Sequence, residues 1–140
     1  MDYHGKPYYS LDAWCKNTYG EKLYKIALDA GLTCPNRDGT LDSRGCIFCS
    51  AGGSGEFAAG RLPGTEPVDG PFSIQEQLEA GKKLLEKKKT GRRYIAYFQA
   101  YTNTYGPVDY LASIYRQALM EPDIAGISIA TRPDCLGTEI

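Results

Sequence analysis

The stretch LYKIALDAGLTC, residues 23–34, decides the fold class of this chain. Its apolar and polar side chains alternate, so Ile26 and Leu28 fall on one face of a predicted strand. Lys25 and Asp29 fall on the other face, where a fully packed barrel centre would carry Val or Leu. The polar face favours an open sheet or a partly filled barrel. There, Lys25 and Asp29 either contact a ligand or pair with each other.

Helices and strands alternate beyond this stretch. Ser73 begins an S-x-x-E capping box, which predicts a helix through Lys89. Residues 94–101 predict a second strand. Pro107 fits the first turn of another helix, and residues 125–131 predict a third strand.

A short helix, capped by Ser10 and ended by Gly20, precedes the first strand. From that strand onward the order is β-α-β-α-β, which calls for parallel strands joined by right-handed crossovers. The carboxyl ends of parallel strands lie at one edge of a sheet. We therefore expect the long loop after the first strand, residues 99–103 and residues 131–134 to meet on one rim.

The composition describes an ordinary globular domain of 140 residues, with 42% hydrophobic residues, 24% charged residues and a net charge of −1. Such a charge gives no general attraction to nucleic acid or membrane. No apolar run approaches the length of a membrane span, and the first ten residues lack a signal-peptide core. These features predict a cytoplasmic protein, where thiols stay reduced. Its five cysteines therefore indicate metal binding or catalysis more strongly than disulfides.

Three cysteines lie in the long Gly- and Pro-rich connection of residues 30–72. Loops longer than about 15 residues are usually functional or disordered, and the cysteines favour function. Cys34, Cys46 and Cys49 are one thiolate short of a closed four-cysteine site, so a metal or cluster here keeps a position for water, substrate or cofactor. From spacing alone, buried thiols or a zinc knuckle compete with this interpretation. The candidates to complete such a knuckle are Cys15, Cys135 and His4.

Four runs of sequence resemble radical S-adenosylmethionine (radical-SAM) proteins: YKIALDAGLTCPNRDGT, GCIFCS, YFQAYTNTY and SIATRPDC. The resemblance is strongest to the YhcC-type branch, a relative of the elongator-type tRNA-modifying enzymes, and begins near Tyr8. It implies that Cys34, Cys46 and Cys49 hold a [4Fe-4S] cluster whose fourth iron binds SAM. The implied enzyme cleaves SAM reductively to a 5′-deoxyadenosyl radical, which abstracts hydrogen from an unidentified substrate, with tRNA as a candidate. The implied electron donor is a flavodoxin or ferredoxin.

The resemblance also implies contacts to SAM and assigns no catalytic residue. Phe48, inside the CxxC, would lie against the adenine. Gln99, Thr102 and Asn103 occupy the place of a turn that receives the methionine amine, and which of them does so stays open. Arg132 either contacts SAM or substrate or pairs with an acidic neighbour.

Three features depart from the superfamily pattern. Eleven residues separate Cys34 from Cys46, an insert that the YhcC-type branch tolerates. Ala130 stands where elongator-type enzymes tend to have Glu. The chain stops after the third strand, although a (β/α) barrel usually needs about 200 residues or more. The predicted fold is thus an incomplete (β/α) barrel of three strands and two crossover helices, and residues 1–140 are the amino-terminal part of one radical-SAM core domain.

Two other functions are compatible with the same residues. The first is a zinc- or nucleic-acid-binding module without catalysis, using the cysteines and a basic patch that also suits a solvated helix end. The second is an inactive fragment whose open sheet edge pairs with another chain. The patch comprises Lys82, Lys83, Lys87, Lys88, Lys89, Arg92 and Arg93.

Overall fold

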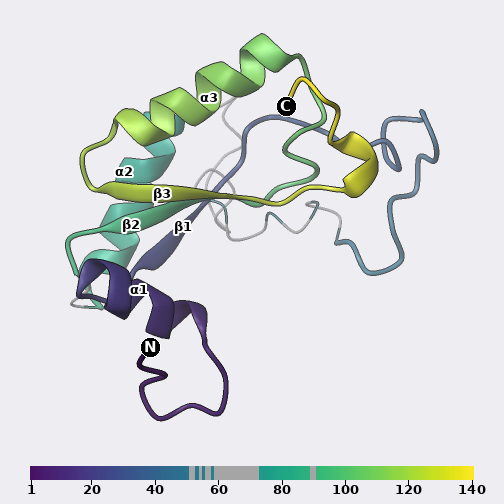
Figure 1. Cartoon of the computed structure of the whole chain (residues 1–140). Helices are drawn as coiled ribbons and strands as arrows, with labels where there is room; N and C mark the ends of the chain where they lie inside the picture. The colour runs from purple at the N-terminus through teal and green to yellow at the C-terminus, as the bar shows by residue number, and fades with distance from the viewer. Residues whose placement is uncertain (51–52, 54, 56–57, 59–72, 89–90) are drawn as a thin grey trace.

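The computed structural model shows an α/β fold built on an open sheet of parallel strands (Figure 1). It describes residues 1–50, 53, 55, 58, 73–88 and 91–140. Within these residues there are three α-helices, three strands and a short 3-10 turn. In chain order they are α1 (Leu11–Tyr19), β1 (Tyr24–Leu28), α2 (Ile74–Glu86), β2 (Tyr94–Phe98), α3 (Val108–Met120), β3 (Ile124–Ile129) and the turn Pro133–Cys135.

The strands pair in the order β1-β2-β3, and both pairings are parallel. Ile26 aligns with Ala96, and Ala96 aligns with Ile127. The register between β2 and β3 shifts at Tyr94 and Ile95. The predicted α/β class with parallel strands is confirmed.

The helix starts follow the sequence signals, with one correction. The Ser10 hydroxyl accepts a hydrogen bond from the backbone N–H of Ala13 at 3.1 Å, and the Ser73–Glu76 capping box is complete. Pro107 was predicted in the first turn of α3 but is its N-cap, in an extended conformation. Helix α2 ends at Glu86, and the predicted end at Lys89 lies outside the described residues.

Strands β2 and β3 are shorter than predicted. Strand β2 ends at Phe98 instead of residue 101, and Tyr101 has a φ of 64°, in the left-handed region that extended strands cannot contain. Strand β3 runs over Ile124–Ile129 instead of residues 125–131. The residues lost from both strands become part of the loops at the carboxyl edge of the sheet.

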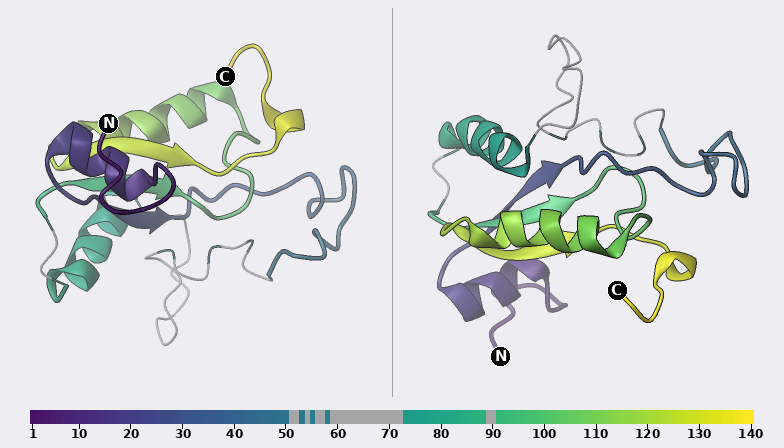
Figure 2. Two further views of the ribbon diagram at one scale, coloured as in Figure 1. Left: turned by 60° about the horizontal axis from the view of Figure 1, so that its bottom comes forward. Right: turned by 90° about the horizontal axis from the view of Figure 1, so that it is seen from above.

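Helices α2 and α3 pack against one face of the sheet, while α1 packs with a separate cluster (Figure 2). Phe98 and Leu28 are fully buried in the larger cluster. The smaller cluster joins Cys15 of α1 to Ile95 of β2. The two faces of the strands therefore have different coverings, as the alternation in β1 predicts.

Buried Gln77 of α2 fixes the chain where it leaves β1. Its side chain accepts a hydrogen bond from the Asp29 backbone N–H at 2.8 Å and donates one to the Asp29 carbonyl at 2.7 Å. The Asp29 carboxylate accepts from the Gly31 backbone N–H at 2.9 Å, and the Lys25 ammonium lies 4.8 Å from the centre of the Tyr97 ring. Lys25 and Asp29 thus each have a protein partner of their own.

Lys82 connects α2 to the turn between α3 and β3. Its ammonium lies 2.8 Å from an Asp123 carboxylate oxygen, 3.2 Å from one of Glu79 and 3.5 Å from one of Glu121. Burial alone would lower the pKa of Lys82, but the hydrogen bonds to Asp123 and Glu79 raise it above its ordinary value. One partly buried cation is therefore shared by three carboxylates.

We expect Lys82→Met to lower the free energy of unfolding by about 1 kcal/mol or more, because it leaves those carboxylates facing one another. Urea denaturation followed by circular dichroism measures the change. Lys83→Met on the exposed side of the same helix is the matched control. Equal unfolding midpoints for the two variants would contradict the role of Lys82.

Candidate functional site

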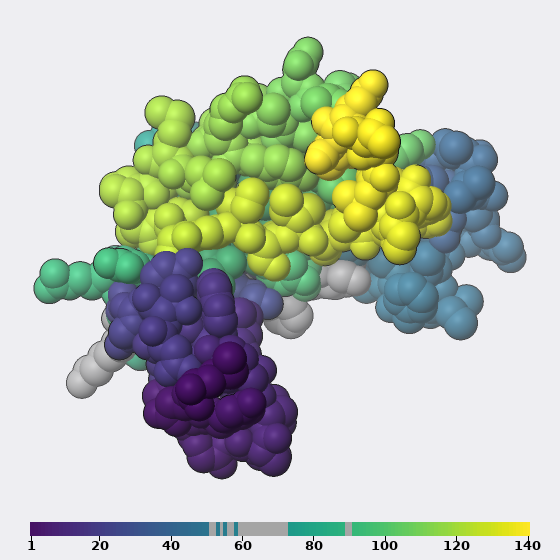
Figure 3. Space-filling model, viewed as in Figure 1, coloured from purple at the N-terminus to yellow at the C-terminus, as the bar shows by residue number. Residues whose placement is uncertain are grey.

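Three loops meet at the carboxyl edge of the sheet, as predicted from the topology. The Thr102 backbone N–H donates to the Thr33 carbonyl at 3.2 Å, which joins the loops after β2 and β1. The Asn103 backbone N–H donates to the Ala130 carbonyl at 2.9 Å, which joins the loops after β2 and β3. In Figure 3 the carboxyl-terminal segment lies beside the cysteine loop at this edge. Backbone hydrogen bonds between the loops therefore form a rim that holds the candidate residues.

Asn103 is the buried centre of this rim. Its side-chain amide donates to the carbonyls of Phe98 at 3.0 Å and Ala130 at 3.2 Å, and the Tyr115 hydroxyl donates to the Asn103 carbonyl. The side-chain oxygen of Asn103 is buried and has no hydrogen-bond partner among the described residues. Asn103 therefore fixes the rim and retains one acceptor atom that the described residues do not use.

Groups from all three loops affect the pKa of the Cys34 thiol. Burial raises the pKa of its thiol, but hydrogen bonds from the Thr102 hydroxyl, the Asn36 backbone and the Arg132 side chain outweigh burial and place that pKa below its ordinary value. The distance from Arg132 Nη1 to the Cys34 sulfur is 3.5 Å. The environment of Cys34 favours its thiolate, the form that binds metals.

Arg132 reaches Cys34 while it is held by Asp134. Its Nε lies 2.9 Å and its Nη2 lies 2.7 Å from the two oxygens of that carboxylate. Of the two predicted roles, the structure shows the pairing with an acidic neighbour and adds the contact to sulfur. The same hydrogen bonds lower the pKa of Asp134.

The CxxC segment forms a turn in which the Cys49 backbone N–H donates to the Cys46 carbonyl at 3.0 Å. The Asn36 side-chain amide donates to the Cys46 sulfur at 3.1 Å. Between the two cysteines, Ile47 and Phe48 are exposed to solvent. Phe48, the predicted adenine contact, is therefore accessible to a ligand. The Gln99 backbone N–H donates to the Leu28 carbonyl at 3.2 Å, which places Gln99 on the same rim.

The three cysteine side chains share one loop but do not form a ready-made ligand set. Within the described part of the chain, which includes Cys34, Cys46 and Cys49, no three His, Cys, Asp or Glu side chains are arranged to hold a metal ion. The chemistry of the donors fits a cluster, because all three are partly exposed thiols and two accept hydrogen bonds at sulfur. Binding one cluster with all three requires the loop to close further.

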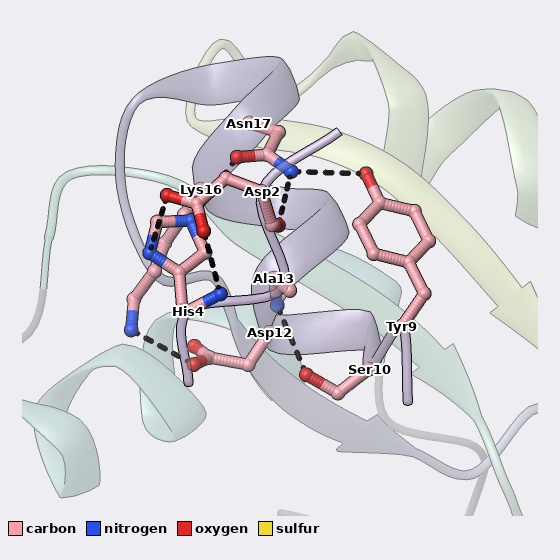
Figure 4. A network of polar contacts seen from close by, with 8 residues as sticks. All are labelled: Asp2, His4, Tyr9, Ser10, Asp12, Ala13, Lys16 and Asn17. Carbon is pink, nitrogen blue, oxygen red and sulfur yellow. Dashed lines mark hydrogen bonds and ion pairs between the residues drawn. The ribbon is translucent and has the colours of Figure 1, made fainter. Parts of the chain in front are cut away.

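The structure separates two of the candidate zinc ligands from this loop. Cys15 is buried with Leu23 and Ile95 in the cluster under α1. His4 belongs to a polar network with Asp2 and Asn17, in which its Nε2 lies 3.0 Å from the Asn17 side-chain oxygen (Figure 4). His4 is exposed to solvent within this network.

Cys135 is the third candidate zinc ligand, and it lies in the rim turn after β3. Burial and the negative charge of Asp134 raise the pKa of its thiol. Cys34 and Cys135 therefore have thiol pKa values shifted in opposite directions.

Sequence reasoning missed Asn36, Arg37 and Tyr101 as site residues. Asn36 and Arg37 lie in the insert between the first two cysteines, where the stretch PNRDG was the available signal. Tyr101 lies in the second rim segment, but the left-handed backbone that directs its ring is visible only in the structure.

The chain is similar to three proteins described as uncharacterised or known only by a designation. It is 45% identical over 135 residues to uncharacterised protein YtqA of Bacillus subtilis. The matched region covers 96% of this chain and 39% of YtqA. It is 41% identical to protein YhcC of Escherichia coli, covering 84% of the chain and 34% of YhcC. It is 34% identical to uncharacterised protein MJ0486 of Methanocaldococcus jannaschii, covering 90% of the chain and 35% of that protein. The chain spans less than half the length of each relative.

These comparisons contradict the identification as the amino-terminal half of a radical-SAM protein. No protein-family model matches the chain, and no solved structure matches it. The names of the relatives assign no superfamily and no activity. The chemistry of the site is therefore inferred from its own residues.

We predict that Cys34 becomes reactive at lower pH than Cys135, because their pKa values are shifted in opposite directions. The measurement is the pH dependence of iodoacetamide alkylation in the metal-free chain, resolved for each cysteine by mass spectrometry. Arg132→Gln should move the Cys34 profile to higher pH, whereas Arg44→Gln, at a residue paired with Asp42, should not. Identical profiles for Cys34 in the wild type and Arg132→Gln would refute this.

Proposed function

We propose that Cys34, Cys46 and Cys49 bind a [4Fe-4S] cluster whose fourth iron is left for SAM. The environment of Cys34 carries this proposal: Arg132 Nη1 lies 3.5 Å from its sulfur, and the pKa of its thiol is lowered, on the rim that also holds the CxxC turn. Hydrogen bonds to the sulfurs are among the features that tune protein-bound clusters. When bound, the cluster supplies the electron that cleaves SAM and so initiates hydrogen abstraction from a substrate.

The residues of the chain have distinct proposed tasks at this site. Arg132, held by Asp134, keeps the Cys34 sulfur oriented. The exposed ring of Phe48 offers an apolar surface for the adenine. Asn103 supports the rim, and its unused acceptor atom is a candidate partner for the methionine amine. Gln99 and Thr102 lie on the same rim, where the Thr102 hydroxyl is engaged with Cys34.

The partners and location are proposed from the same chemistry. The substrate is unidentified, with tRNA as a candidate, and the electron donor is a one-electron carrier such as flavodoxin or ferredoxin. A thiolate-bound cluster suits a reducing compartment, which supports a cytoplasmic location. Among the described residues, no helix combines the length and the apolar character that a membrane span needs.

We also propose that the sheet and its helices form an incomplete (β/α) barrel. Two β-α-β units with parallel pairing and a site at the carboxyl edge support it. Lys25, on the second face of β1, is compatible with a ligand-containing interior.

Anaerobic reconstitution with iron and sulfide should give a brown protein with about four irons per chain. Single Ala substitutions of Cys34, Cys46 or Cys49 should each remove most of that iron, because each takes away one ligand. Cys135→Ala is the matched control on the same rim. Iron content and the electron paramagnetic resonance of the reduced protein measure the outcome.

Two results would contradict the proposal. One tightly bound zinc and no iron would instead favour a zinc-binding module. A cluster whose resonance signal does not change when SAM is added would refute the assignment of SAM to the fourth iron.

A further inference from the structure

Arg37 connects the CxxC turn to the loop after β2. Its Nη2 donates to the Ser50 carbonyl and lies 3.5 Å from the Cys49 carbonyl, so its contacts fall at the end of the CxxC. The centre of its guanidinium lies 5.6 Å from the centre of the Tyr101 ring. One side chain therefore contacts both the segment that carries two of the sulfurs and the neighbouring rim loop.

Two glycines make room for this arrangement. Gly45 has a φ of 79°, and a Cβ added there would lie 2.9 Å from Arg37 Nε. Gly53 has a φ of 62°, and a Cβ added there would overlap the Tyr101 ring. The Tyr101 backbone N–H donates to the Gly53 carbonyl at 2.9 Å. The backbone on both sides is thus shaped to admit the guanidinium and the ring.

These contacts suggest a structural role for the insert between the first two cysteines. A longer loop loses more entropy when its ends are brought together. Arg37 lies within the insert and links its backbone to Ser50, while Asn36 in the same insert bonds to the Cys46 sulfur. The insert therefore supplies the groups that order the CxxC turn.

We infer that Arg37 is a positioning residue that seats the Cys46–Cys49 turn on the rim for cluster binding. This role rests on the proposed function and adds a residue to it. The planar guanidinium donates hydrogen bonds while it stacks on an aromatic ring, a combination that a lysine cannot reproduce. Arg37→Lys keeps the positive charge, so this substitution tests the guanidinium itself.

The first test uses the metal-free chain. Arg37→Lys and Gly45→Ala should speed alkylation of Cys46 and Cys49 about tenfold, the effect of losing one hydrogen bond to a charged group. The rate at Cys34 should change by less than about twofold, because its donors remain in place.

Matched controls exist in the same loop. Arg44→Lys alters an arginine paired with Asp42, and Gly39→Ala alters a glycine with a φ of 91° and nothing within 4 Å of an added Cβ. The difference between Gly45→Ala and Gly39→Ala therefore reports the displacement of Arg37. Equal rates in the variants and their controls, or a uniform rise at all cysteines, would overturn the inference.

The second test measures how fast a chelator removes iron from the reconstituted chain. Loss should be about tenfold faster for Arg37→Lys and Gly45→Ala than for their controls. Iron held equally long by all four variants would overturn the role of Arg37 and leave the proposed function intact. A wild-type chain that binds no iron would overturn both.

Discussion

Parallel pairing of the three strands is the constraint on which the rest of the structure depends. It places the ends of β1, β2 and β3 at one edge, so segments far apart in the sequence become neighbours there. Backbone hydrogen bonds from Thr102 and Asn103 then join the three loops. The contact of Arg132 with Cys34, across 98 positions of sequence, exists because of that pairing.

Electrostatics and hydrogen bonding give the rim its chemical character. Cys34 has a lowered pKa because donors from three loops outweigh the effect of burial. Burial and Asp134 have the opposite effect on Cys135, which lies in the turn after β3. Two thiols on the same rim are therefore chemically different, and the difference favours Cys34 as a metal ligand.

The sequence predicts the framework well and the site only in outline. The order of helices and strands along the chain and the capping box at Ser73 follow from local signals whose physical causes act over a few residues. The left-handed backbone of Tyr101 and the buried amide of Gln77 depend on tertiary contacts, which no local pattern encodes. Motif resemblance drew attention to the cysteine loop but gave an identification that the comparisons contradict.

In the proposed site, three sulfurs of one loop would leave a single iron of a cluster open to SAM. Mössbauer spectroscopy of the chain reconstituted with ⁵⁷Fe, recorded with and without SAM, tests it most directly. We expect SAM to change the isomer shift of about one iron in four and to leave the others as they were. Iron whose spectrum is the same in both samples, or iron that is not in a cluster, would contradict the account.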